Sequence, residues 1–347
     1  MAQITKVAKA KSESQKGALM RMLPTTRLFQ LNLLSIGMFF LACGIRPQVI
    51  LAQSLQEIRI GSTNIAATNF CTFYARDRHF FQREGLDAKI IIVRTEVGLT
   101  ALSVGNLDFS TLSTSSIEAT VRGMPLRVVA ITNRYPLLGL VVPPGMKEVA
   151  ELKGKKVAIS SFGGAVYSAA LQLLKHHNFK PQQDVILLAS GANVARIAAL
   201  KQKHVDAAII SSPDDLRVAR EGFKILMDVG TLYRLPFGGI STSASKIRDN
   251  PRQVERVVRA VIQATQAITE PRNKPDVLNY IETFFKVDRE VAGDFYSRLL
   301  PSLNPSGIVD HDKIKLVIDS ALERDPTSKP VEPEAVIDFS FARKLGS

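Results

Sequence analysis

Short apolar runs alternate with helical patterns along the chain from residue 57 onward. Strands are predicted where β-branched or alternating apolar residues are bounded by turn residues, at residues 57–61, 88–93, 108–112, 126–132, 137–142, 156–160, 185–188, 207–211 and 224–228. Helices are predicted where apolar positions recur every three or four residues, at residues 67–83, 96–104, 116–122, 164–177, 192–201 and 214–220. Strand followed by helix at this spacing is typical of βαβ units on a parallel sheet, so an α/β protein is predicted.

Two Pro/Gly-rich segments interrupt this alternation, at residues 143–145 and 235–239. The strand–helix pattern restarts after the first, and the chain from residue 250 is mainly helical after the second. Two interruptions allow the chain to cross to a second lobe and return. We therefore predict a first lobe of residues 53–142 and 237–347, a second lobe of residues 143–236, and a two-crossing hinge. A simple two-domain chain with a separate helical domain is the alternative that periodicity leaves open.

The two α/β blocks resemble each other at one step. Residues 105–111 and 203–209 each run from a helix end through an aspartate, Asp108 or Asp206, into an apolar strand that small hydroxylated residues follow. Unrelated strand-to-helix connections that use the same loop residues would give the same pattern, which is the alternative to an internal repeat.

The N-terminus has the three parts of a secretory signal peptide. A basic segment ends at Arg27, an apolar run spans residues 28–45, and Ala52 offers a small residue for cleavage. A permanent membrane anchor and lipidation of Cys43 are the alternatives. All three treat residues 1–52 as a leader and place the folded part in the periplasm or outside the cytoplasm, with membrane contact only through the leader or a lipid. Cys71 then has no disulfide partner and is expected to be a small buried hydrophobe.

The net charge of +13 does not indicate a nucleic-acid partner. Seven basic residues and one acid lie in the leader, and the remaining excess is spread without a basic run. Nucleic-acid binding favours a concentrated patch, so no such partner is expected.

Four strand-to-helix junctions are rich in hydroxylated or small residues. Ligands of open parallel sheets bind beyond the carboxyl ends of strands, where hydroxyls and free backbone N–H groups either cap the next helix or hold a polar or anionic group. We expect a ligand site there, formed by Thr63, Asn64, Thr114, Ser115, Ser116, Ser161, Phe162, Gly163, Gly164, Ser211 and Ser212.

Aromatic and cationic residues near the interruptions complete this expected site. Phe162, Tyr167, Tyr233 and Phe237 offer a stacking wall, although packing at the hinge is the alternative. Arg134 follows a strand and is the candidate cation of the cleft, with a solvated surface arginine as the alternative. The glycine pair 163–164 matches neither a phosphate loop nor a dinucleotide fingerprint.

Catalytic, metal and cofactor motifs are not found in the sequence. It contains neither Gly-x-Ser-x-Gly nor His-Glu-x-x-His, and none of the five histidines has a metal-ligand partner at the next helical turn. We therefore expect no catalytic residues, no metal and no cofactor.

Four segments resemble one protein family. They are residues 74–87 (Tyr-Ala-Arg-Asp-Arg-His-Phe-Phe-Gln-Arg-Glu-Gly-Leu-Asp), 105–110, 122–129 and 152–159. They are similar to segments of the nitrate/sulfonate/taurine-type solute-binding proteins of ABC transporters, in the thiamine-pyrimidine-synthase-like superfamily. The similarity covers residues 57 to 300.

This resemblance implies a type II periplasmic-binding-protein fold, with a small, often anionic ligand held between two lobes. It also implies a transporter permease as partner, and we expect a monomer. Eukaryotic relatives include an enzyme, a thiamine-pyrimidine synthase, whose Cys-rich motif and His/Lys pattern are not evident here. A sensory binding protein without a transporter is a further alternative.

Overall fold

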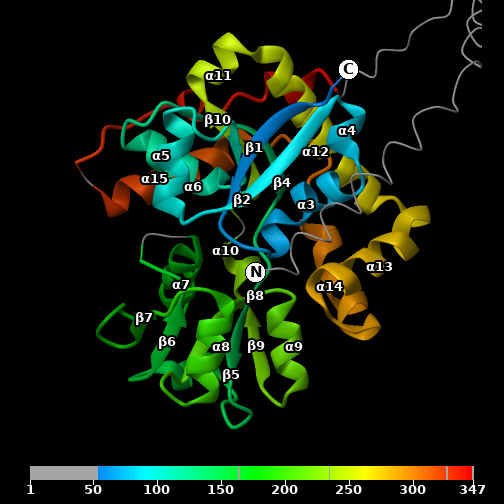
Figure 1. Ribbon diagram of the computed structural model, residues 1–347. Helices are drawn as coiled ribbons and strands as arrows, with labels where there is room; N and C mark the ends of the chain where they lie inside the picture. Colours follow the sequence, from blue (N-terminus) through cyan, green and yellow to red (C-terminus); the bar gives the residue numbers. More distant parts are fainter. Residues whose placement is uncertain (1–53, 163–164, 234, 326, 346–347) are drawn as a thin grey trace, which may run out of the picture. The chain divides into compact units, whose positions relative to one another are not determined.

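The computed structural model describes residues 54–162, 165–233, 235–325 and 327–345 (Figure 1). The predicted leader with Cys43, and the glycine pair 163–164, lie outside the described residues. The described strands form two five-stranded sheets, and helices accompany both (Figure 1). The predicted α/β class is confirmed.

The first sheet has the order β2-β1-β3-β10-β4. Its strands are β1 (Gln56–Ser62), β2 (Leu86–Ile92), β3 (Phe109–Ser110), β4 (Leu126–Asn133) and β10 (Phe237–Ser243). β1 pairs in parallel with β2 and β3, whereas β10 runs antiparallel between β3 and β4. The sheet is therefore mixed, with β10 as its one antiparallel strand.

The second sheet has the order β7-β6-β8-β5-β9. Its strands are β5 (Leu138–Val142), β6 (Lys156–Ile159), β7 (Ile186–Ala189), β8 (Ala207–Ser211) and β9 (Lys224–Asp228). β6 pairs in parallel with β7 and β8, and β5 runs antiparallel to β8 and β9. Each sheet thus contains one strand that opposes the others.

The described helices connect the strands and form most of the C-terminal part. They are α3 (Phe70–Asp77), α4 (Phe80–Arg83), α5 (Thr95–Ser103), α6 (Ser113–Val121), α7 (Ala165–His176), α8 (Asn193–Lys201), α9 (Asp214–Arg220), α10 (Val229–Tyr233), α11 (Ala244–Asp249), α12 (Pro251–Thr269), α13 (Lys274–Phe285), α14 (Arg289–Ser302), α15 (His311–Arg324) and α16 (Ser340–Arg343).

Helix α12 holds the C-terminal part on the first sheet. Its apolar residues recur every three or four positions, so Val254, Val257, Val261 and Ile268 share one face and are fully buried. This face packs on α3, α4 and β4. Because burying one such side chain contributes roughly 1.5–3 kcal/mol, the helix is a main support of the first core.

The strand β10 was not predicted, because its start was interpreted as an interruption. Gly238 and Gly239 have φ of +71° and +146°, which L side chains rarely adopt. A Cβ on Gly239 would lie 2.1 Å from the carbonyl oxygen of Ala130, and one on Gly238 would lie 2.4 Å from that of Thr68. The glycine pair therefore permits close backbone approach inside the sheet, and the chain continues as a central strand.

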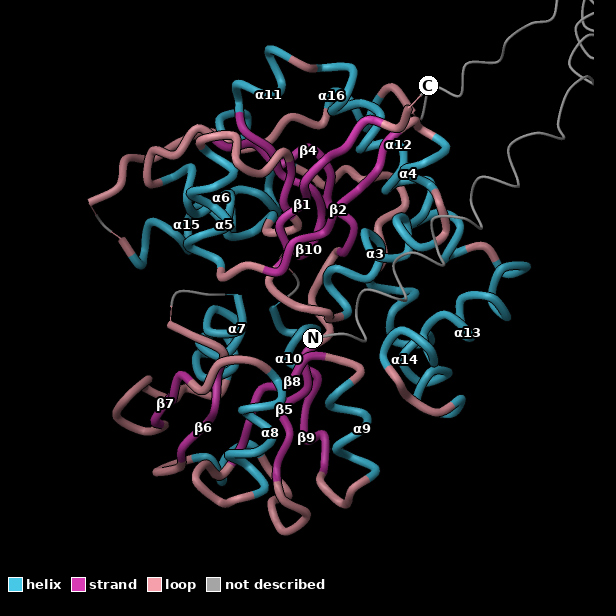
Figure 2. The backbone as a smooth tube through the Cα atoms, viewed as in Figure 1, coloured by secondary structure: helices cyan, strands magenta, loops and turns pink. Residues whose placement is uncertain are grey.

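The first crossing also differs from its predicted place. We predicted that the second lobe begins at Pro143, but β5 pairs with β8 and β9 and so belongs to the second sheet. The first crossing is residues 134–137, between β4 and β5, and the second runs from β9 through α10 to β10 (Figure 2). Two crossings join the two sheets, as predicted.

The resemblance between the two blocks corresponds to one shared hydrogen-bond pattern. Asp108 Oδ2 accepts a hydrogen bond from the backbone N–H of Arg59 (2.8 Å), and the backbone N–H of Asp108 donates to the carbonyl of Arg59 (2.9 Å). Asp206 makes the same pair of bonds with Lys156, both at 2.9 Å. In each lobe the aspartate therefore fixes the amino-terminal side of two neighbouring parallel strands.

Candidate ligand-binding site

The carboxyl ends of the parallel strands gather at one edge of each sheet, and both crossings leave from these edges. β4 ends at Asn133 beside the start of β10, and β5 begins at Leu138 opposite Ser211, the last residue of β8. Five Cα steps separate Asn133 from Leu138, so the two edges are joined by at most about 17 Å of extended chain. The predicted junction residues of both lobes therefore belong to two neighbouring edges.

Hydrogen bonds within the first lobe hold the loop after β1. Thr111 Oγ1 donates to Ser62 Oγ (3.2 Å), and Ser62 Oγ donates to the carbonyl of Asn64 (3.2 Å). The Nδ2 atom of Asn69 donates to both the carbonyl and Oδ1 of Asn64 (3.0 and 3.1 Å). Asn64 remains exposed and Thr63 is half-buried, so this loop is ordered while it still presents polar groups.

The first turns of α6 use some of the predicted hydroxyls inside the lobe. Thr114 Oγ1 donates to the carbonyl of Pro236 (3.1 Å), which lies on the second crossing. Ser116 Oγ donates to Ser241 Oγ on β10 (2.8 Å), and both are buried. Ser113 Oγ is buried at the first helical position without a hydrogen-bond partner among the described residues, and Ser115 is half-buried. The sequence interpretation did not include Ser113.

The register of the second sheet brings its junctions together. β6 pairs with β8 so that Val157 opposes Ala207, which places Ser161 and Phe162 beside the end of β8. Ser161 and Phe162 are both exposed. Ser211 and Ser212 are buried, so at this junction the backbone is more accessible to a ligand than the hydroxyls.

A buried arginine lies beneath the second edge. Arg196 on α8 donates to Asn193 Oδ1 (2.6 Å) and to the carbonyl of Ile209, and its Nε has no partner among the described residues. Asn193 in turn accepts from the N–H of Ser211 (3.2 Å). Burial lowers the pKa of Arg196 to about 10, so the group stays charged at neutral pH. Asp214, which accepts a bond from Asn193 Nδ2 (2.8 Å), is the negative charge that interacts with Arg196 and partly balances it at this edge.

The sequence interpretation missed Asn193 and Arg196, although both lie near the start of the predicted helix 192–201. The available signal was an asparagine at the helix start and an arginine one turn later on its apolar face.

One backbone contact joins the two edges directly. The N–H of Ala67, after β1, donates to the carbonyl of Ser212, after β8 (3.3 Å). The loop that carries Thr63 and Asn64 therefore lies against the loop that carries Ser211 and Ser212. The structure brings these four predicted residues together.

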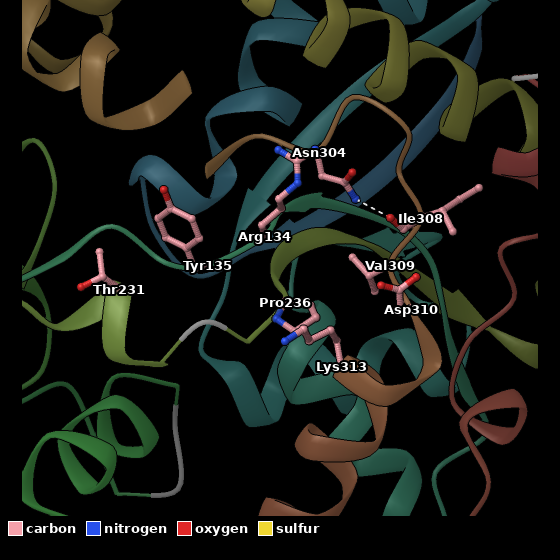
Figure 3. A pocket seen from close by; sticks show the side chains of 9 residues that line it. All are labelled: Arg134, Tyr135, Thr231, Pro236, Asn304, Ile308, Val309, Asp310 and Lys313. Atoms are coloured by element: carbon pink, nitrogen blue, oxygen red, sulfur yellow. Dashed lines mark hydrogen bonds between the residues drawn. The ribbon is translucent and has the colours of Figure 1, made fainter. Parts of the chain in front are cut away.

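Arg134 lies on the first crossing, directly after β4. It is exposed, and its Nη1 donates to the carbonyl of Leu303 (2.5 Å). It lines a cavity of about 380 Å³ (Figure 3). The other lining residues are Tyr135, Thr231, Pro236, Asn304, Ile308, Val309, Asp310 and Lys313. Both crossings border this cavity.

The two remaining aromatic candidates lie on the second crossing. Phe237 is the first residue of β10, is half-buried and packs against the core that α7, β5 and α15 share. Tyr233 is the last residue of α10. The packing of Phe237 fits the hinge-packing alternative.

The carboxylates that follow the Ser211–Ser212 loop are bonded within the protein: Asp214 accepts from Asn193 Nδ2 and Asp215 accepts from Arg298 Nη1, both at 2.8 Å. In the described part of the chain, no three His, Cys, Asp or Glu side chains could share a metal ion. Burial raises the pKa of the Cys71 thiol to about 11, which keeps it protonated and unreactive. The arrangement can donate hydrogen bonds and orient a charge. No helix among the described residues is long and apolar enough to cross a membrane.

Comparisons with known proteins agree on family and fold. The family model described as NMT1/THI5 like matches residues 67–274. No sequence among curated proteins matches the chain. The alkanesulfonate-binding protein SsuA of Xanthomonas axonopodis pv. citri, bound to MOPS, is 20% identical with a TM-score of 0.67, over 81% of this chain and 98% of that one.

Two further solved structures show the spread of similar proteins. The periplasmic nitrate-binding protein NrtA of Synechocystis PCC 6803 is 14% identical with a TM-score of 0.68, over 84% of this chain and 88% of that one. DszB in complex with biphenyl-2-sulfinic acid is 16% identical with a TM-score of 0.63, over 84% and 98%. The chain belongs to the NMT1/THI5-like family and has the type II periplasmic-binding-protein fold, with two α/β lobes joined by two crossings.

Proposed function

We propose that the protein is the extracytoplasmic solute-binding component of an ABC importer. It captures a small polar or anionic organic solute between its lobes and delivers it to a permease, without chemical change. The observation that carries this proposal is the meeting of two strand-end edges, each with polar loops and helix N-termini, at two short crossings. The binding proteins SsuA and NrtA share this fold, which supports the assignment.

Closure follows from the crossings. Residues 134–137 and the segment around Pro236 connect otherwise separate sheets, so small backbone rotations there change the distance between the edges. A ligand that contacts both edges stabilises the closed state by its differential affinity for the two states. A permease that contacts both lobes then distinguishes loaded from empty protein.

Ser161 provides the sharpest test of the site. A tryptophan at this exposed position after β6 would fill the space beside the end of β8, whereas Ser297, exposed on α14, offers a matched control. The solute is first identified by mass spectrometry of protein purified from its native host. At a concentration of a hundred times Kd it should stabilise the wild type by about 2.7 kcal/mol, or about 4 °C in the unfolding midpoint.

We expect Ser161→Trp to abolish this shift and Ser297→Trp to retain it. Full retention by Ser161→Trp would contradict the site assignment. If no solute is recovered and X-ray scattering shows no contraction with any candidate, the capture function itself is wrong.

An enzyme of the thiamine-pyrimidine-synthase type is the second candidate, because the family that the sequence resembles includes such an enzyme. The deeply buried Cys71, whose thiol pKa is raised to about 11 by burial, favours binding over bond-making. Incubation of the recovered solute with the protein separates the two: conversion of the solute would identify an enzyme. Genes for a permease and an ATPase beside this one would favour transport over a sensory role.

A further inference from the structure

Exposed apolar side chains gather at the strand-end edges of both lobes. Ten large apolar side chains are exposed in the described part of the chain, and six of them lie at the carboxyl end of a strand, in the connection to the next helix or in the first turn of that helix. Five of the six are exposed by 52% to 72%: Ile65, Ile92, Val97, Phe162 and Val194; the sixth is Ile91, beside Ile92 on β2, at 37%. Single exposed apolar residues are normal on protein surfaces, but a gathering at one place calls for a partner.

Three of the five border the polar loop of the first lobe. Ile92 is the last residue of β2 and pairs with Ser62, whose hydroxyl is part of the network after β1. Val97 lies in the first turn of α5, and Ile65 lies three residues beyond β1. Apolar surface therefore adjoins the polar groups at this edge.

The second lobe repeats the arrangement. Phe162 lies three residues beyond β6, and its ring packs edge-on against Tyr167 at 5.4 Å, with more than half of the residue exposed. Val194 follows Asn193, the residue that bonds both to Ser211 and to the buried Arg196. It is the most exposed of the ten, at 72%. Polar and apolar groups thus alternate at this edge too.

The other exposed apolar residues do not form such a group. Leu55 precedes β1, Ile186 begins β7, and Val104 directly follows α5, so these three lie at the amino-terminal side of their sheets. Leu316 lies on α15. The gathering is specific to the edges where the ligand site is proposed.

We propose that the ligand is a small organic molecule with an apolar body, whose polar end lies on the hydroxyl-rich loops and whose body contacts Val97 and Ile92 from one lobe and Val194 and Phe162 from the other. This inference rests on the proposed function. An inorganic oxyanion such as nitrate or bicarbonate would use the polar loops alone and leave the apolar rim in water. An apolar body removes that rim from water when the lobes close, which adds to the closing free energy.

A homologous series of probes tests the apolar body. Straight-chain sulfonates and carboxylates from one to six carbons, together with nitrate and bicarbonate, are titrated into the wild-type protein by calorimetry. Each buried methylene should raise the affinity about fourfold until the space is filled. The heat-capacity change of binding should become more negative along the series, as burial of apolar surface requires.

Two valines of one helix supply a matched comparison. Val97 and Val104 are both exposed, at opposite ends of α5. We expect Val97→Ser and Val194→Ser to flatten the dependence of affinity on chain length while the one-carbon probe binds as in wild type. Val104→Ser should keep the wild-type dependence. Circular dichroism and the unfolding midpoint verify that all three variants are folded.

The outcomes separate this inference from the function on which it rests. If nitrate, bicarbonate or a one-carbon probe binds as tightly as the six-carbon probe, or if Val97→Ser and Val194→Ser keep the wild-type gradient, the apolar body is refuted while solute capture stands. A native solute without an apolar part has the same meaning. Failure to recover a solute, together with no binding by any probe, would overturn both proposals.

Discussion

Replacing Arg298 with methionine should destabilise the protein far more than a typical surface ion pair would. Arg298 lies on α14, and its Nη1 and Nη2 atoms bond to Asp215 Oδ2 (2.8 Å) and Asp228 Oδ2 (3.0 Å) of the second lobe. The Asp215 side chain is fully buried, and a Cβ on Gly139 would lie only 2.7 Å from its Oδ2. Without Arg298, this carboxylate loses its charged partner and has no path to water.

The expected loss follows from this burial. Removing one member of a buried ion pair costs about 3–5 kcal/mol, because the remaining charge is left without compensation. The lower end applies here, since the Arg298 side chain is itself 22% exposed. For a folded part of this size, about 3 kcal/mol corresponds to roughly 5 °C in the unfolding midpoint.

Urea unfolding at pH 7 measures this loss, with unchanged m-values as the check that the same transition is compared. The matched control is Arg220→Met on α9: its pairs with Glu290 and Asp294 are exposed, so their loss should change the midpoint little. Adding Asp215→Asn to Arg298→Met should restore most of the stability, because it removes the stranded charge. Equal, small effects of both arginine substitutions would refute the argument.

The pH dependence gives the same prediction a second readout. Burial raises the pKa of Asp215, and the Arg298 charge offsets part of that rise. In Arg298→Met the offset is gone, so the folded state binds its proton more tightly than the unfolded state does. Stability contributed by protonation is present at low pH and is lost as the pH rises through the folded pKa. The deficit of the variant should therefore be smaller at pH 5 than at pH 8.

Three further predictions concern the first lobe and the C-terminal helices. Gly239→Ala should cost about 3 kcal/mol or more in urea unfolding, because its Cβ meets the carbonyl of Ala130. Gly293→Ala, inside α14 with nothing within 4 Å of the new Cβ, should instead stabilise by about 0.5–1 kcal/mol. Burial raises the pKa of Glu118 above its ordinary value of 4.5 despite its bond to Arg324. Its contribution to stability therefore falls as pH rises through the folded pKa, and Glu118→Gln should flatten that part of the stability–pH curve.

The regular alternation of strand and helix patterns along the chain made much of the fold predictable. Residues 207–211, 214–220 and 224–228 were predicted as strand, helix and strand, and β8, α9 and β9 have these bounds. Local composition failed where a tertiary contact overrides it. The predicted helix 67–83 is divided at His79, which adopts a left-handed backbone conformation between α3 and α4. At β10 the glycines signal close packing rather than a turn.

The candidate site was predictable in outline only. A strand end followed by hydroxylated residues can be recognised locally, and register then places Ser161 beside Ser211. What a hydroxyl bonds to depends on partners far along the chain. Thr114 and Ser116 find theirs 122 and 125 residues away, on the second crossing and on β10. The strand β10 and the partners of these hydroxyls were missed for the same reason, because both depend on contacts between residues far apart in the sequence.

The C-terminal helices have a role that the sequence did not reveal: they bond to both lobes. Arg324 at the end of α15 donates to Glu118 on α6 of the first lobe (2.6 Å) and to Ser168 on α7 of the second (2.7 Å). Arg298 on α14 reaches the second lobe in the same way.

Any rotation about the two crossings must therefore keep, exchange or break these charge-assisted bonds. The Glu118 bond stays within one lobe, whereas the weaker bond to the Ser168 hydroxyl joins the two lobes and can open at modest cost. Separating Arg298 from the buried Asp215 would instead leave a buried charge without its partner. A rotation that opens the Ser168 bond and keeps the Arg298 pair would move α7 more than α9 relative to the C-terminal helices. Phe162 and Tyr167 lie on the α7 side, so such a rotation would move an apolar part of the proposed site.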